Sequence, residues 1–240
     1  MTYNTPLLPQ ISEVWQDLNW QPNADQQLIF QRLYEQIIQA NQTLNLTRIT
    51  QPLEFWEKHL WDSLRGIAPL LERRVGEWES GRVGELPTPN RSLKIIDIGT
   101  GAGFPGIPCA IALPDSQVTL LDSVRKKISF LDTLLPQLGI QNATTLIGRA
   151  EIINQEFQYK QAYDVALIRA VGSACVCAEY ALPLLKPGGL AILYRGNWTT
   201  EETKALQNTV KKLGGLIETV EEFTTPVTNS IRHCVHLRTK

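Results

Sequence analysis

No feature constrains the fold of this chain more than residues 95–106, which read IIDIGTGAGFPG. An apolar run rich in isoleucine passes directly into a turn with four glycines in eight residues, and a helical pattern follows. Glycine can adopt positive φ and lets a backbone approach a ligand closely. Open parallel sheets bind their ligands at the carboxyl ends of the strands. The segment therefore predicts a buried strand, a ligand-binding turn and a helix, in that order.

The pattern around this segment predicts an α/β fold. Short β-rich runs alternate with helical stretches from residue 93 onward, which is typical of βαβ units and a parallel sheet. We expect strands at 93–98, 118–121, 144–147, 163–168, 189–194, 216–223 and 233–237. We expect helices at 106–113, 124–138, near 150, at 173–185 and at 200–213. The prediction is a doubly wound sheet of about seven strands.

Residues 1–71 differ from the rest because they carry helical patterns and no strand pattern. A short helix is expected near 11–18, a longer one after a cap at Asn23, and a third from Pro52. Apolar stripes at helical spacing run along the second and third of these: Leu28, Ile29, Leu33, Ile37 and Ile38, then Leu53, Trp56, Leu60 and Leu64. Residues 72–92 are charged and rich in Gly and Pro. We therefore divide the chain into a helical extension (1–71), a charged connecting segment (72–92) and a sheet domain (93–240).

Composition narrows the class of protein. Hydrophobic residues make up 43% of the 240 residues, which is enough for a full core, and no apolar run is long enough for a membrane span. The four cysteines do not have the spacing of a zinc site, and we expect them, like Trp15, Trp56 and Trp61, to fill the core. The net charge is −1, so any RNA-binding surface must be a local cluster. We expect a cytoplasmic, metal-free protein.

Two further motifs concern the ligand. Residues 101–106 also fit the dinucleotide pattern G-x-G-x-x-G, and Asp122 ends the second strand about 20 residues after the turn, where a carboxylate can bind ribose hydroxyls of NAD or of S-adenosylmethionine. Residues 185–189, LKPGG, resemble a segment of Rossmann-like class I methyltransferases, whose last strand is antiparallel. The D-x-G-x-G-x-G spacing of residues 97–103 resembles their first motif. We therefore favour a methyltransferase over an NAD enzyme.

The order of shorter motifs resembles one family, the RsmG (GidB) methyltransferases of small-subunit ribosomal RNA. The segments concerned are 45–47 (NLT), 58–63 (KHLWDS), 99–106 (GTGAGFPG), 121–123 (LDS), 125–127 (RKK), 149–151 (RAE), 168–170 (IRA) and 232–233 (RH). The family usually has Lys-Gly after the fifth strand, where this chain has Arg195-Gly196.

This resemblance implies methylation of guanine N7 in the decoding-region loop of 16S rRNA, with S-adenosylmethionine as cofactor. The implied cofactor contacts are Asp97, Gly99, Gly101, Gly103 and Phe104 at the turn, Asp122, Ser123 and Val124 at the ribose, and Ala150 and Glu151 at the adenine. Arg169, at the end of the fourth strand, would face both cofactor and target, and His59 would contact the pocket or the RNA. We take Arg169 and His59 as the candidate catalytic residues.

Guanine N7 carries a free lone pair and no proton, so its methylation needs alignment rather than a general base. The expected partner is 16S rRNA or the small ribosomal subunit, and we expect a monomer. Three alternatives stay open at this stage: a methyltransferase for a small molecule, an RNA-binding module without catalysis, and, more distantly, an NAD enzyme. A closed apolar pocket without a basic rim would favour the first, and a failure to bind S-adenosylmethionine would favour the second.

Overall fold

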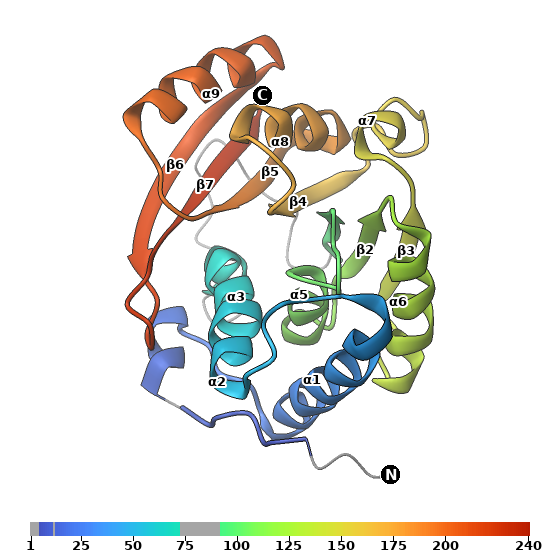
Figure 1. The fold of residues 1–240 in the computed structure, drawn as a ribbon. Helices are drawn as coiled ribbons and strands as arrows, with labels where there is room; N and C mark the ends of the chain where they lie inside the picture. The colour runs from blue at the N-terminus through green and yellow to red at the C-terminus, as the bar shows by residue number, and fades with distance from the viewer. Residues whose placement is uncertain (1–4, 12, 73–91) are drawn as a thin grey trace.

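The computed structural model describes residues 5–11, 13–72 and 92–240. Helices cover both faces of a central sheet (Figure 1). The elements of the N-terminal part are η1 (Glu13–Leu18), α1 (Ala24–Leu44), α2 (Pro52–Phe55), η2 (Trp56–Trp61), α3 (Asp62–Gly66) and α4 (Ala68–Glu72). Those of the sheet part are β1 (Lys94–Ile98), α5 (Gly106–Ala112), β2 (Gln117–Asp122), α6 (Arg125–Gln137), β3 (Ala143–Ile147), α7 (Ala150–Ile153), β4 (Tyr163–Arg169), α8 (Ala174–Ala181), η3 (Leu182–Leu184), β5 (Leu185–Arg195), α9 (Thr200–Lys212), β6 (Gly215–Thr224) and β7 (Ile231–Thr239).

The sheet has seven strands in the order β3-β2-β1-β4-β5-β7-β6. Strands β1 to β5 pair in parallel, and β7 is antiparallel to both of its neighbours. This confirms the predicted Rossmann-like class I methyltransferase sheet. From β1 the chain adds β2 and then β3 on one side. It then crosses back and places β4 on the other side of β1. The carboxyl ends of β1 and β4 therefore meet at the point where the winding reverses, which is where such sheets bind ligands.

Strand residues alternate between two hydrophobic layers, as side chains of a pleated strand must. On β1, Ile95 belongs to the hydrophobic cluster that includes residues of α1, α5 and α6, whereas Ile96 belongs to the cluster that includes residues of α7, α8 and α9. The same alternation places Val165 and Ala166 of β4 on opposite faces. Helices cover both faces, and most residues of the inner strands β1 and β4 are apolar and buried, as expected for a buried parallel sheet.

The helical extension shares one hydrophobic cluster with the sheet domain. Gly66 of α3 lies against the ring of Tyr194 on β5, and the hydroxyl of Tyr194 donates a hydrogen bond to the carbonyl of Ser63 at 2.8 Å. In Figure 1, α1, α2 and α3 lie on the face of the sheet that α5 and α6 also cover. Asn23 caps α1 and Pro52 begins α2, as predicted. The tryptophans at 15, 56 and 61 are buried, also as predicted.

Some expectations were wrong in detail. Leu28 and Leu53 are about half exposed, because Phe30 and Phe55 lie on the faces that contact the core. Cys175 is only partly buried, unlike the other cysteines. Helix α8 ends at Ala181 rather than near 185, and β5 begins at Leu185, where Leu185 pairs with Tyr163 before the register shifts. The predicted connecting segment, 72–92, lies almost entirely outside the described residues.

Candidate active site

The glycine turn follows β1 and is held by the end of β2. The backbone amides of Gly99 and Thr100 both donate to the carbonyl of Leu121, at 2.8 and 2.9 Å. Gly99 has φ +73°, and a Cβ built on it would lie 2.5 Å from Val171 Cγ2. Gly101 also has positive φ, but the nearest atom to a Cβ there is the Gly99 carbonyl oxygen at 3.9 Å. Gly99 is therefore required by close packing with the loop after β4, whereas Gly101 leaves open space above the turn.

Asp97 lies beneath this turn and is fully buried. Its Oδ2 accepts hydrogen bonds from the Thr100 hydroxyl at 2.6 Å and from the Gly106 amide at 2.8 Å. Burial raises the pKa of Asp97 to about 6, although these two hydrogen bonds act to lower it. Asp97 thus supports the turn and the start of α5 from below. It does not line the cavity above the turn.

A cavity of about 540 Å³ opens above the turn at the carboxyl ends of β1, β4 and β5. Its walls come from both parts of the chain: Leu46, Ile49, Lys58, His59, Asp62, Gly99, Thr100, Gly101, Ala102, Phe104, Lys127, Arg169, Ala170, Tyr194, Arg195, Gly196 and Arg232. Five of these residues are lysine or arginine, and Asp62 is the one carboxylate among them. Apolar and cationic side chains thus line the same cavity. It brings together five of the predicted cofactor-binding and catalytic residues, namely His59, Gly99, Gly101, Phe104 and Arg169.

The remaining predicted cofactor contacts lie beside the cavity, at the ends of β2 and β3. The Asp122 carboxylate accepts from the Gly101 amide at 2.9 Å and from the Val124 amide at 2.8 Å, so it joins the glycine turn to the loop after β2. Ser123 is exposed and Val124 is 43% exposed. Residues 150–151 begin α7, next to Asp122, because the Gly148 amide donates to the Asp122 carbonyl at 3.1 Å.

Gly103 packs inward rather than toward the cavity. It has φ +97°, and a Cβ there would lie 2.4 Å from Ile107 Cδ1. Gly103 is therefore a structural member of the turn, as Asp97 is.

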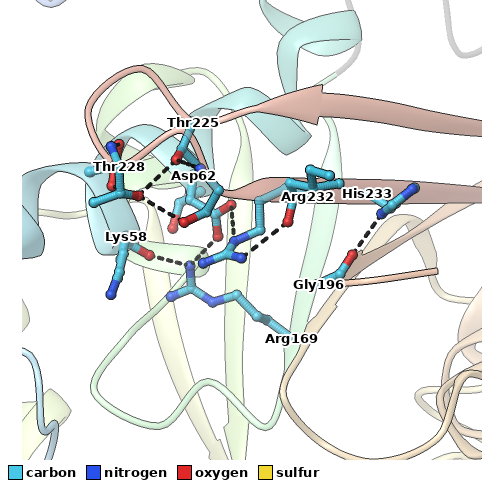
Figure 2. A network of polar contacts seen from close by, with 12 residues as sticks. Lys58, Asp62, Arg169, Gly196, Thr225, Thr228, Arg232 and His233 are labelled. Atoms are coloured by element: carbon cyan, nitrogen blue, oxygen red, sulfur yellow. Dashed lines mark hydrogen bonds and ion pairs between the residues drawn. The ribbon is translucent and has the colours of Figure 1, made fainter.

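Arg169 extends from the end of β4 and is held by the helical extension (Figure 2). Its Nη1 donates to the carbonyl of Lys58 at 3.0 Å and to Asp62 Oδ2 at 3.0 Å. The guanidinium also lies over the ring of Phe104, with Cζ 5.8 Å from the ring centroid. The other oxygen of Asp62 lies 4.0 Å from Arg232 Nε of β7. Residues from three distant segments therefore meet at one carboxylate.

His59 lies in the π-helical turn η2 and stacks on Phe104, with ring centroids 4.5 Å apart and ring planes 9° from parallel. Its Nε2 is 2.8 Å from the Thr47 hydroxyl, which also accepts from the Ile49 amide. If the hydroxyl proton goes to Nε2, the imidazole carries its own proton on Nδ1. Nδ1 is buried and has no hydrogen-bond partner within the described part of the chain. Burial, then the charges of Arg169 and Lys58, lower the pKa of His59 to about 3, so the ring is neutral at physiological pH.

The structure adds cavity residues that the sequence reasoning had not assigned. Lys58 lies next to His59 in η2, and Tyr194 lies at the end of β5 beside Arg195. The position of Tyr194 and Arg195 at a strand carboxyl end could have indicated them. Lys58 begins the motif segment 58–63, but no pattern indicated that it faces the cavity, because a π-helical turn has no recognised sequence pattern and changes which residues face inward.

The chain matches the family described as rRNA small subunit methyltransferase G over residues 26–234. It belongs to this family. Among curated members, the Ribosomal RNA small subunit methyltransferase G of Nostoc punctiforme is 61% identical over 98% of this chain and 91% of that protein. The protein of the same name from Microcystis aeruginosa is 48% identical over 98% of this chain and 100% of that protein. The protein is thus a member of a family of methyltransferases for small-subunit rRNA, which confirms the resemblance found in the sequence.

Solved structures agree on the fold of this family member. The citrinin polyketide synthase CMeT domain superposes with a TM-score of 0.54, at 14% identity, over 75% of this chain and 52% of that one. M. jannaschii TYW2 in complex with AdoMet gives 0.50 at 15% identity, over 62% of this chain and 68% of that one. In the parts of the chain that the structure describes, no helix has the length and apolarity to cross a bilayer, and no group of three potential ligands could hold a metal ion.

Proposed function

We propose that this methyltransferase transfers a methyl group from S-adenosylmethionine to N7 of a guanine in the decoding-region loop of 16S rRNA. The observation that carries the proposal is the cavity at the reversal point of the sheet. There the glycine turn that follows β1 and Arg169 of β4 line the same cavity, together with other cationic side chains. A nucleoside-derived ligand and an RNA phosphate backbone both suit that combination.

The residues present fit S-adenosylmethionine. The open space above Gly101, into which a Cβ would project without contact closer than 3.9 Å, lets a ligand lie directly on the turn. Asp122 already orders the turn through Gly101, and its carboxylate oxygens keep lone pairs for ribose hydroxyls. Ser123, Val124, Ala150 and Glu151 would surround the rest of the adenosine. When bound, the cofactor supplies a methyl group that its sulfonium makes electrophilic.

The side chains of the cavity suit a reaction that needs no base. Guanine N7 has an in-plane lone pair and no proton to lose, so alignment is the main requirement. His59 has a pKa of about 3 and is a weak base, and the Asp62 carboxylate is paired with Arg169. We assign to His59 a neutral ring that stacks on Phe104 and shapes the cavity wall, and to Arg169 the unpaired donors of its guanidinium. These donors would hold the acceptor base or the cofactor in place.

The charge of the cavity favours RNA over an apolar small molecule as the acceptor. Lys58, Lys127, Arg169, Arg195 and Arg232 lie in its walls, although the whole chain has a net charge of −1. Cations clustered at one site create the local field that a nearly neutral protein needs for an RNA partner.

The test is transfer of labelled methyl from S-adenosylmethionine to small ribosomal subunits from a strain without this enzyme, with the modified base mapped. Naked 16S rRNA is assayed in parallel. Arg169→Ala should lose most of the transfer. Arg238→Ala is the matched control, because Arg238 is an equally buried arginine of β7 whose partner, Glu218, lies outside the cavity.

Label at N7 of one guanine in the decoding-region loop would support the proposal. Label at another base, or at another atom of guanine, would refute the assignment to N7 while leaving the family unchanged. Absence of label on both forms of RNA, with cofactor binding intact, would direct the search toward small-molecule acceptors.

A further inference from the structure

The carboxylate of Asp62 links three segments that are far apart in the sequence (Figure 2). Asp62 is the first residue of α3 and is only 7% exposed. Its Oδ2 lies 3.0 Å from Arg169 Nη1, and its Oδ1 lies 4.0 Å from Arg232 Nε. The contact with Arg169 is a hydrogen bond and is therefore directional, whereas Arg232, at 4.0 Å, is held by charge attraction.

The contact with Asp62 leaves most donors of the Arg169 guanidinium free. The protein uses only Nη1, which serves both Asp62 and the Lys58 carbonyl. Within the described residues, Nε and Nη2 of Arg169 have no protein acceptor, and the side chain lines the cavity. The ring of Phe104 lies against the guanidinium. Arg169 is thus held through Nη1 and through one face of its guanidinium. Its remaining donors, Nε and Nη2, are available to a ligand.

Charge alone would predict a different role for Asp62. Among the described residues that line the cavity it is the one carboxylate, beside five cations, so its removal raises the local positive charge by one. If Asp62 only adjusted that charge, its loss would strengthen the binding of RNA, since phosphate attraction grows with positive charge. If Asp62 orients Arg169, its loss would slow transfer without weakening RNA binding.

We propose that Asp62 is a positioning residue for methyl transfer, which holds Arg169 and Arg232 in one arrangement facing the acceptor base. This inference rests on the proposed transfer to RNA. It assigns a function to the docking of the helical extension: α3 brings to the cavity the carboxylate that orders arginines from β4 and β7. Misplacement of a group near the reacting atoms by about 1 Å can cost about a hundredfold in rate.

The chain offers a matched control for the structural role of the same helix. Arg65 of α3 forms an ion pair with Glu221 of β6, and its guanidinium lies 4.7 Å from the ring centroid of Phe223. This pair also ties α3 to the β6–β7 hairpin, but neither partner lines the cavity. Glu221→Gln therefore removes one ion pair between the same elements without changing the cavity wall.

The experiment compares wild type, Asp62→Asn, Glu221→Gln, Arg169→Met and the double variant Asp62→Asn/Arg169→Met. For each, the stoichiometry of S-adenosylmethionine binding gives the folded fraction, and steady-state transfer to small subunits gives kcat and KM. We expect Asp62→Asn to lower kcat per folded site by about tenfold or more, with KM unchanged or lower. Glu221→Gln should stay within about twofold of wild type. In the Arg169→Met background, Asp62→Asn should have almost no further effect.

Three results would overturn the inference. The first is a loss of activity that equals the loss of folded sites, which would make Asp62 purely structural. The second is a higher KM with unchanged kcat, which would make it a binding contact. The third is full multiplication of the two single effects in the double variant. A wild-type protein that transfers no methyl to RNA would instead refute the proposed function, so the two failures are distinguishable.

Discussion

The docking of the helical extension onto the sheet depends on the absence of a side chain at Gly66. A Cβ on Gly66 would lie 2.2, 2.3 and 2.5 Å from Cε1, Cζ and Oη of Tyr194. The Tyr194 ring is buried, and its hydroxyl donates to the Ser63 carbonyl at 2.8 Å. The ring therefore cannot move aside without losing a buried hydrogen bond. We predict that Gly66→Ala destabilises the protein.

Two effects of opposite sign decide the size of this change. Replacing glycine by alanine inside a helix stabilises by about 0.5–1 kcal/mol. Forcing an extra methyl into a packed core costs about 1–3 kcal/mol, and weakening the Tyr194 hydrogen bond adds about 0.5–1.5 kcal/mol. The expected net loss is about 0.5–4 kcal/mol, and the Tm should fall by about 2–4 °C for each kcal/mol in a chain of this size.

The assay is thermal and urea unfolding of four proteins: wild type, Gly66→Ala, Tyr194→Leu and the double variant. Leucine lacks the two ring carbons and the hydroxyl oxygen that the new methyl would contact. The cost of Gly66→Ala should therefore vanish, or become a small gain, in the Tyr194→Leu background. An equal cost in both backgrounds, or a higher Tm for Gly66→Ala alone, would refute the packing argument and with it the single core shared by extension and sheet.

Three further predictions concern the site and its supports. Gly101→Ala should weaken the binding of S-adenosylmethionine in calorimetry, since its Cβ would enter the open space above the turn, and should also lower the Tm, because alanine at the positive φ of this position is strained by about 1–2 kcal/mol; unchanged affinity would contradict the proposed cofactor position. The folded pKa of His59, about 3, lies below its ordinary 6.5, so the stability that neutral His59 contributes is complete above pH 6.5 and is lost as the pH falls toward 3. His59→Gln should therefore lose less stability than wild type between pH 7 and pH 4.5 in urea unfolding, and an identical loss would mean that His59 is not held neutral. Glu57 is fully buried and accepts hydrogen bonds from the Val227 amide and from the amide and hydroxyl of Thr228, so Glu57→Ala should cost about 1–3 kcal/mol or more, whereas the control Glu54→Ala removes only a partly exposed ion pair and should cost less than about 1 kcal/mol.

The sequence by itself determined the sheet and the position of its ligand. Local patterns at residues 95–106 and at the later strands specify strand, turn and helix, since apolar periodicity and glycine conformation act over a few residues. The motif order also identified the family before any contact was known. Arg169, Phe104 and the turn glycines all lie where predicted, at the carboxyl ends of the central strands, because parallel strands place these ends together.

Only the tertiary structure decided which of these side chains share one cavity and how each is held. Asp97 was expected at the cofactor but lies under the turn, because the chain buries its carboxylate against Thr100 and Gly106. Asp62 belongs to the motif segment 58–63, but only folding showed that its carboxylate lies between Arg169 and Arg232. The contacts of Asp62 join residues more than a hundred positions apart, and the energies of all these contacts depend on burial and on the direction of each donor. A pattern over neighbouring residues carries no information on either quantity.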